Sequence, residues 1–147
     1  MESVNKVQLA EMLAVYAHYG QTDKAGAPYI THPRAVAAQM DADDEKTVAY
    51  LHDVLEDTFV TEQTLRNLFG DRICDAVVSM THCPVESYEQ YVRRLGQDPL
   101  ARKVKLADLR HNMDLSRLPV VTSRDRKRQE KYKKAAIYLE NMIFQEQ

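Results

Sequence analysis

A histidine and three carboxylates lie within six residues of one another near the middle of the chain. His52, Asp53, Glu56 and Asp57 form the stretch HDVLED, and His52 falls on the apolar stripe of an expected helix. Because residues one turn apart share a helix face, the pairs His52/Glu56 and Asp53/Asp57 are expected on neighbouring rows of one helix. These charges repel one another unless a cation joins them, and a divalent metal ion is the simplest one. The alternative is a solvated helix end beside an ordinary core histidine.

A second polar face lies in the segment 103–115. Lys105, Asp108 and Asn112 are three and four residues apart, which places them on one face of one helix. Apolar residues flank this face, so we expect Asp108 to be half-buried. Asp108 is therefore either a metal ligand or the partner of Lys105 in an ordinary i,i+3 ion pair.

The other histidines differ in their surroundings. His32 stands at an expected helix start after a glycine-containing loop and is either a ligand or a residue of the helix start. His18 is interpreted mainly as structural, with orientation of that loop or of a ligand as the alternative. His82 and His111 are interpreted mainly as structural. His82 adjoins Cys83, but no other thiolate or imidazole has the spacing of a zinc site.

Helices must position all of these residues. The chain holds only 4 glycines and 5 prolines, and no segment shows a sustained alternation typical of strands. We therefore expect an all-α, compact single-domain bundle of about eight helices spanning residues 1–147. Thr61 is a predicted N-cap, Gly70 a predicted stop, and Asp98-Pro99 a predicted cap and first turn. The expected helices cover about residues 7–16, 33–40, 44–57, 62–69, 71–80, 86–95, 99–115 and 123–147.

Composition excludes several classes of protein. The chain has 147 residues, 44% of them hydrophobic and 29% charged, and a net charge of −2, which does not suit a general polyanion binder. We therefore expect no nucleic-acid partner. Cys74 and Cys83 are too few for a disulfide framework. No apolar run approaches the roughly 18 residues of a membrane span and the start is no signal peptide, so a cytoplasmic protein with no membrane partner is expected.

Three stretches together resemble one family. They are AHYGQTDKAGAPYITHP at residues 17–33, AYLHDVLEDT at 49–58 and VKLADLRHNM at 104–113. Their order resembles the ligand pattern of HD-domain metal-dependent phosphohydrolases, which is a lone histidine, then His-Asp, then a distant aspartate. More narrowly, the chain resembles the hydrolase domain of bifunctional Rel/SpoT proteins and the small alarmone hydrolases. The combination of HDxxED with KxADxxxN is specific, whereas HD alone is weak.

The resemblance implies a role for each matching residue. One divalent ion, Mn²⁺ in this family, would be bound by His32, His52, Asp53 and Asp108. The attacking water would be positioned or deprotonated by the catalytic residues Glu56 and Asp57. The nucleotide substrate would be contacted by Lys24, Lys105 and Asn112. The reaction implied is removal of the 3′-pyrophosphate of guanosine tetra- or pentaphosphate, which gives GDP or GTP and pyrophosphate.

The sequence departs from the family where the substrate base is expected. The loop before His32 reads Asp23-Lys24, where the family usually has Arg-Lys, and an aspartate cannot supply a guanidinium plane. After Asn112 the family commonly has a polar stretch with a threonine, which is absent here. The metal-binding and hydrolytic residues are intact, whereas the base specificity is open.

Two alternative functions are compatible with the sequence. The first alternative is an HD phosphohydrolase acting on another nucleotide, such as a 5′-nucleotidase, and the second is a non-catalytic metal- or nucleotide-binding helical protein. Glu56 argues against the second, since a binding protein needs no base beside its ligands. The basic stretch from Arg124 to Lys134 is either a solvated helix face or a source of cations for the pyrophosphate. The sequence does not define the oligomeric state.

Overall fold

The computed structural model describes residues 4–146, and over these residues the chain is all-helical, with no β-strand. The expected fold class is confirmed, and the helices number nine because a single extra turn, α4, separates from α3. Their bounds are α1 Lys6–Ala17, α2 Thr31–Ala38, α3 Asp43–Leu51, α4 Val54–Asp57, α5 Glu62–Phe69, α6 Asp71–Ser79, α7 Tyr88–Leu95, α8 Pro99–Met113 and α9 Ser123–Glu146.

Side-chain caps define several of the helix ends. The Thr61 side chain accepts a hydrogen bond from the backbone N–H of Thr64 at the start of α5. Gly70 ends that helix with a φ of 86°, a conformation that favours glycine. Asp98 accepts hydrogen bonds from the backbone N–H groups at the start of α8, directly before Pro99. These three sequence predictions are confirmed.

The expected continuous helix through residues 44–57 is wrong. α3 ends at Leu51, and α4 begins only at Val54. Nδ1 of the His52 ring lies 2.6 Å from the backbone oxygen of Ala49, which in a continuous helix would accept from the N–H of Asp53. His52 therefore competes with the helix for this carbonyl, and the chain turns between the two helices.

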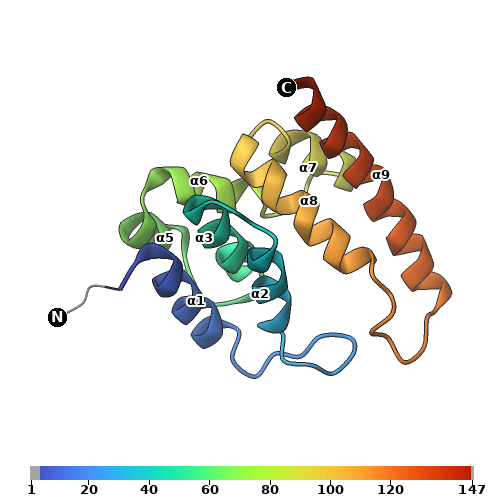
Figure 1. The fold of residues 1–147 in the computed structure, drawn as a ribbon, viewed down its shortest axis with the longest axis horizontal. Helices are drawn as coiled ribbons and strands as arrows, with labels where there is room; N and C mark the ends of the chain where they lie inside the picture. The colour runs from blue at the N-terminus through green and yellow to red at the C-terminus, as the bar shows by residue number, and fades with distance from the viewer. Residues whose placement is uncertain (1–3, 147) are drawn as a thin grey trace.

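Helix α8 lies at the centre of the molecule (Figure 1). Its first half packs into an apolar cluster with α1, α2, α3, α5 and α6, which includes Val36, Leu51 and Val104. Its second half joins α7 and α9 in another cluster around Leu95, Leu109 and Leu139. The two clusters hold α8 from both sides, so a side chain in the middle of α8 is fixed relative to α2 and α3.

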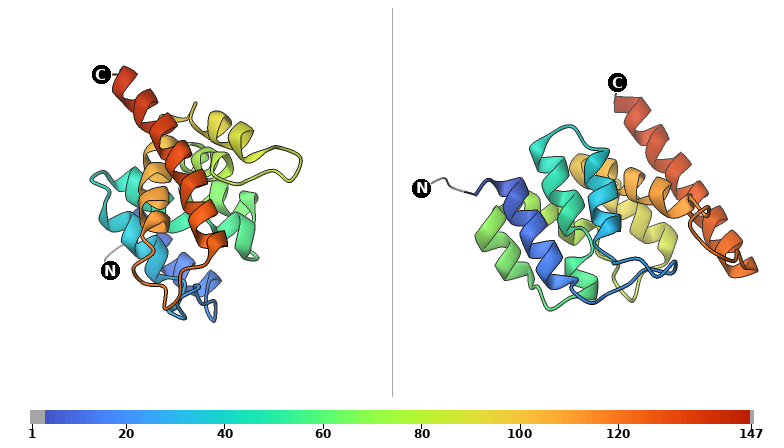
Figure 2. Two further views of the ribbon diagram at one scale, coloured as in Figure 1. Left: turned by 90° about the vertical axis from the view of Figure 1, so that its right-hand side faces the viewer. Right: turned by 60° about the horizontal axis from the view of Figure 1, so that its bottom comes forward.

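Two loops lie at one end of this bundle. The segment 18–30, between α1 and α2, and the segment 114–122, between α8 and α9, both appear at the lower edge of Figure 1 and come forward in the right-hand view of Figure 2. Residues of both loops line one cavity. No helix among residues 4–146 is long and apolar enough to cross a membrane.

Candidate metal centre

Two imidazoles and a carboxylate from three helical segments converge in the interior. His32 comes from the first turn of α2, His52 directly follows α3, and Asp108 lies within α8. Nε2 of His32 is 3.3 Å from Nε2 of His52 and 2.7 Å from Oδ1 of Asp108. Nε2 of His52 is 3.4 Å from the same oxygen. All three residues are buried.

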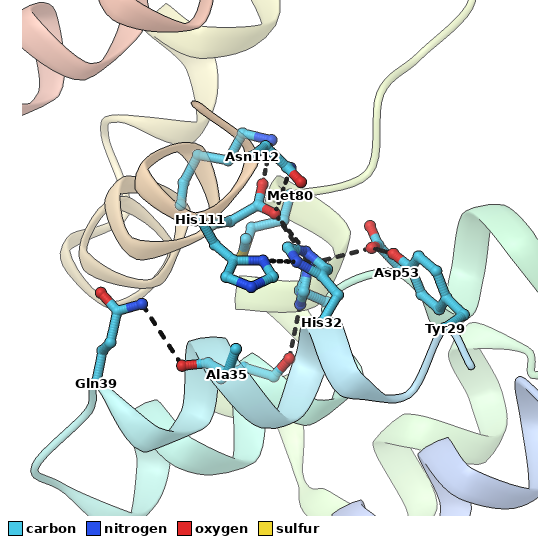
Figure 3. A network of polar contacts seen from close by, with 12 residues as sticks. Tyr29, His32, Ala35, Gln39, Asp53, Met80, His111 and Asn112 are labelled. Atoms are coloured by element: carbon cyan, nitrogen blue, oxygen red, sulfur yellow. Dashed lines mark hydrogen bonds and ion pairs between the residues drawn. The ribbon is translucent and has the colours of Figure 1, made fainter. Parts of the chain in front are cut away.

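Asp53 completes this group of side chains. Its Oδ2 lies 3.1 Å from Nε2 of His52 and accepts a hydrogen bond from the hydroxyl of Tyr29. Figure 3 shows Tyr29 and Asp53 on one side of His32, with His111 and Asn112 of α8 on the other. The structure therefore brings together the four residues expected to bind metal.

The donor set fits a divalent cation. Bonds of about 2.1 Å to a metal place adjacent ligand atoms about 3.0 Å apart at right angles, and the separations of 2.7 to 3.4 Å surround this value. Two imidazole nitrogens and two carboxylate oxygens suit first-row transition metals. The cluster is therefore a candidate site for one divalent ion.

The outer nitrogens of both rings are engaged, which fixes the orientation of each imidazole. The contact of His52 Nδ1 with the Ala49 carbonyl requires a proton on Nδ1, so Nε2 is the ring nitrogen that can offer a lone pair to a metal ion. Nδ1 of His32 lies 2.7 Å from Nδ1 of His111, and one of these two nitrogens must donate. Both rings thus direct Nε2 toward the shared centre.

Lys105 places a positive charge beside Asp108, on the side of the carboxylate that faces away from the two imidazoles. Its Nζ donates to Oδ2 of Asp108 over 2.8 Å, and its side chain is only 13% exposed. Burial opposes ionisation of both groups, but Lys105 and His52 together hold the pKa of Asp108 well below its usual range. In the same way Asp108 outweighs burial and raises the pKa of Lys105. Asp108 is thus an ionised carboxylate with one oxygen left for the cluster.

Two further carboxylates extend the cluster toward solvent. Glu56 and Asp57 are exposed residues of α4, and one oxygen of each lies within 4.8 Å of the others and of Asp53. An oxygen of Glu56 also accepts the backbone N–H of His82, which holds the side chain in place. Burial, followed by the charges of Asp53 and Asp57, raises the pKa of Glu56 despite that hydrogen bond.

A cavity of about 370 Å³ is connected to the centre through one residue, Asn112. Asn112 lines this cavity and donates from Nδ2 to Oδ1 of Asp108 over 3.1 Å, so its amide connects the two. Lys24 lines the outer part, and its side chain is 57% exposed. Lys105, by contrast, is buried beneath Asp108 and does not line the cavity.

Sequence reasoning missed two contacts of the centre. Tyr29 is three residues before His32, and His111 is three residues after Asp108, so helical spacing from Asp108 is a signal for His111. Tyr29 lies in a loop, where no periodicity predicts its contact with Asp53. Nδ1 of His18 lies 2.9 Å from the side-chain oxygen of Gln21, whose amide donates to the backbone of Asp57, so His18 contacts the same loop.

Comparisons with known proteins show which family the chain belongs to. The chain is 35% identical to the bifunctional (p)ppGpp synthase/hydrolase SpoT of Escherichia coli K12 over 127 residues, which cover 76% of this chain and 18% of that protein. It is 38% identical to the guanosine-3′,5′-bis(diphosphate) 3′-pyrophosphohydrolase of Haemophilus influenzae over 117 residues, or 69% of this chain and 17% of that one. The chain thus spans less than a fifth of the length of these relatives.

A solved structure shows the same fold. It is described as a metazoan ortholog of SpoT that hydrolyses ppGpp, and it superposes with a TM-score of 0.74 at 23% sequence identity, covering 95% of this chain and 87% of that one. The model of the HD domain family matches residues 10–136, which include every residue of the cluster. The chain therefore belongs to the HD domain family and is related to the SpoT-type hydrolases.

Proposed function

We propose that this protein is a metal-dependent phosphohydrolase that removes the 3′-pyrophosphate of guanosine tetra- or pentaphosphate or of a closely similar nucleotide. The observation that carries the proposal is the convergence of His32, His52, Asp53 and Asp108 next to Glu56, in a chain related to SpoT-type hydrolases. Mn²⁺ is the ion proposed, from the family resemblance and the mixed nitrogen and oxygen donors.

A bound divalent ion supplies Lewis acidity and lowers the pKa of water from 15.7 toward about 7. The chain's own residues do the rest. Glu56 accepts a proton from the attacking water, and its raised pKa brings it nearer to neutral pH, where a general base is most effective. Asp57, one residue along the same turn, positions that water. The water oxygen forms the new bond to phosphorus, and the ribose 3′-oxygen leaves and takes up a proton.

Other residues hold the substrate and the ligands. Asn112 lies between Asp108 and the cavity, where its amide can orient the ribose or the phosphate. Lys24, at the rim, contributes a cation for the same nucleotide. Lys105 acts as a positioning residue in this proposal, because it holds Asp108 and lies away from the cavity wall.

An activity screen over nucleotide phosphates with Mn²⁺ tests the proposal. Release of pyrophosphate from ppGpp is the expected result. Glu56→Gln is expected to abolish turnover while the metal stays bound. Glu140→Gln is the matched control, because Glu140 is an exposed carboxylate of α9 that pairs with Arg110 on the other side of α8. Product formed only from a 5′-nucleotide, as inorganic phosphate, would replace this proposal with the 5′-nucleotidase alternative. Undiminished turnover by Glu56→Gln would remove Glu56 from the role of base.

A further inference from the structure

The cavity beside Asn112 has the size of part of a nucleotide. Its volume of about 370 Å³ lies near the lower end of the range for small-molecule sites, which is about 300 to 1,000 Å³. Because Asn112 joins it to Asp108, a substrate with its scissile phosphate at the candidate metal centre would reach this cavity with its other end. The lining of the cavity therefore selects that end.

The charges around the cavity are balanced. Nζ of Lys24 is 3.8 Å from Oδ1 of Asp125, and Nη1 of Arg128 is 3.5 Å from the same oxygen. A polyphosphate needs an excess of cations, whereas a neutral wall of donors and acceptors suits a polar, uncharged ring. The charged residues that line the cavity are Lys24, Arg117, Arg128, Asp23, Asp114 and Asp125.

Asp23 faces this cavity with one free oxygen. Its Oδ1 accepts the backbone N–H groups of Ala25 and Ala27, both over 2.9 Å, and so fixes the loop. Its Oδ2 is buried and has no hydrogen-bond partner among residues 4–146. The nearest cation to Oδ2 is Arg117, whose Nη1 lies 3.6 Å away, too far for a hydrogen bond and near enough for an ion pair.

Arg117 comes from the opposite loop, between α8 and α9. Its side chain is 41% exposed, so the guanidinium keeps donors and a flat face for a ligand. Arginine stacks on planar rings and donates to ring acceptors. Arg117 offers the plane and the donors that a nucleobase requires, and the carboxylate of Asp23 beside it restrains the position of the guanidinium.

We propose that Arg117, positioned by Asp23, recognises the nucleobase of the substrate. The inference rests on the proposed function for the presence of a nucleotide, and it adds the residue and the loop that bind the base. A guanidinium thus faces the cavity from the loop 114–122, although the other loop carries an aspartate where the resemblance leads one to expect an arginine.

Calorimetric binding to the Mn²⁺-loaded protein tests this role. The probes are GMP, AMP and ribose 5-phosphate, which share a phosphorylated ribose and differ in the base. Arg117→Gln is expected to raise the Kd of at least one nucleotide about tenfold, the usual cost of losing a base-stacking group, and to leave the Kd of ribose 5-phosphate unchanged. Arg126→Gln is the matched control, because Arg126 is exposed and outside the cavity lining.

The positioning role of Asp23 is tested by a double-mutant cycle. Asp23→Asn is expected to weaken nucleotide binding less than Arg117→Gln, and the double variant is expected to bind no more weakly than Arg117→Gln alone. An Asp23→Asn variant that weakens nucleotide and ribose 5-phosphate equally would show a collapsed loop and remove the positioning role.

Several results would overturn the proposal. Equal weakening of all three probes by Arg117→Gln would make Arg117 a phosphate ligand. Base recognition by Arg117 would be excluded if Arg117→Gln bound the nucleotides as tightly as the wild type. It would also be excluded if the wild-type protein bound ribose 5-phosphate as tightly as the nucleotides, or bound none of the three probes. Base-dependent binding without hydrolysis of any pyrophosphorylated nucleotide would instead contradict only the proposed function.

Discussion

The ammonium of Lys105 and the carboxylate of Asp108 form a buried ion pair one turn apart on α8, over 2.8 Å. The pair uses Oδ2 of Asp108, while Oδ1 of the same carboxylate faces the rings of His32 and His52. One carboxylate therefore joins a fixed internal cation to the place where a metal ion would bind. The stability of the metal-free protein and its affinity for metal are coupled through Asp108.

Lys105→Met is expected to destabilise the metal-free protein by about 3 kcal/mol, because it leaves a buried carboxylate without its cation. Mn²⁺ should restore more stability to the variant than to the wild type, since the ion takes over the neutralisation of Asp108. Urea unfolding with and without Mn²⁺ measures both effects. Lys103→Met is the control, because Lys103 lies on the same helix α8, has a side chain that is 46% exposed and pairs with Glu45 of α3. Equal losses in the two variants would contradict the special role of Lys105.

His52→Ala is expected to remove most of the bound metal. His52 contributes Nε2 to the centre and also holds the Ala49 carbonyl, so its loss removes a ligand and loosens the turn before Asp53. Elemental analysis after dialysis should find about one ion per chain in the wild type. The control His82→Ala changes an exposed histidine outside the cluster and should retain the ion. Full metal content in the His52 variant would refute the site.

Tyr29→Phe is expected to weaken metal binding by about tenfold, because the hydroxyl donates to Asp53 and outer hydrogen bonds of this kind commonly change affinity by about 10- to 100-fold. Competition with a fluorescent chelator measures the change. Tyr19→Phe removes a hydroxyl from a side chain of the same loop that is 88% exposed, and it should have no effect. An unaltered affinity in the Tyr29 variant would show that Asp53 keeps its position without this contact.

Local signals in the sequence account for much of the helical framework. Thr61, Gly70 and Asp98 each act within four residues of themselves, which is why their roles as caps or stops follow from residue type and spacing. The break at His52 could not be predicted in this way. It depends on which way the imidazole points, and this is decided by packing against α2 and α8.

The candidate centre was predicted from the resemblance more than from spacing. Asp108 is 76 residues from His32, and no local periodicity indicates that they meet at 2.7 Å. The partners of these residues were harder still to predict. Tyr29 reaches Asp53 from a loop, and Arg117 approaches Asp23 from another loop, so both contacts depend on how the loops pack at the end of the bundle.

Asp98→Ala is expected to destabilise the metal-free protein by about 1 to 2 kcal/mol at pH 7, because Asp98 caps α8. Asp98 also pairs in bidentate fashion with Arg72, through two contacts of 3.0 Å. Burial opposes its ionisation, but Arg72 and the backbone N–H groups lower the pKa of Asp98 below its ordinary value.

The sign of the pH dependence follows from that shift. Below pH 3.8, the ordinary pKa of an aspartate, Asp98 is protonated in the unfolded chain but still ionised in the folded chain. The free energy of unfolding therefore falls as the pH drops toward the lowered pKa of the folded state. The stability difference between wild type and Asp98→Ala should therefore be full at pH 7 and shrink below about pH 4. Asp98→Asn, which keeps the cap without the charge, should retain most of the stability and lose this pH dependence. Thermal unfolding between pH 2.5 and 7 measures the three proteins. A difference between wild type and Asp98→Ala that stays constant down to pH 2.5 would contradict the lowered pKa of Asp98.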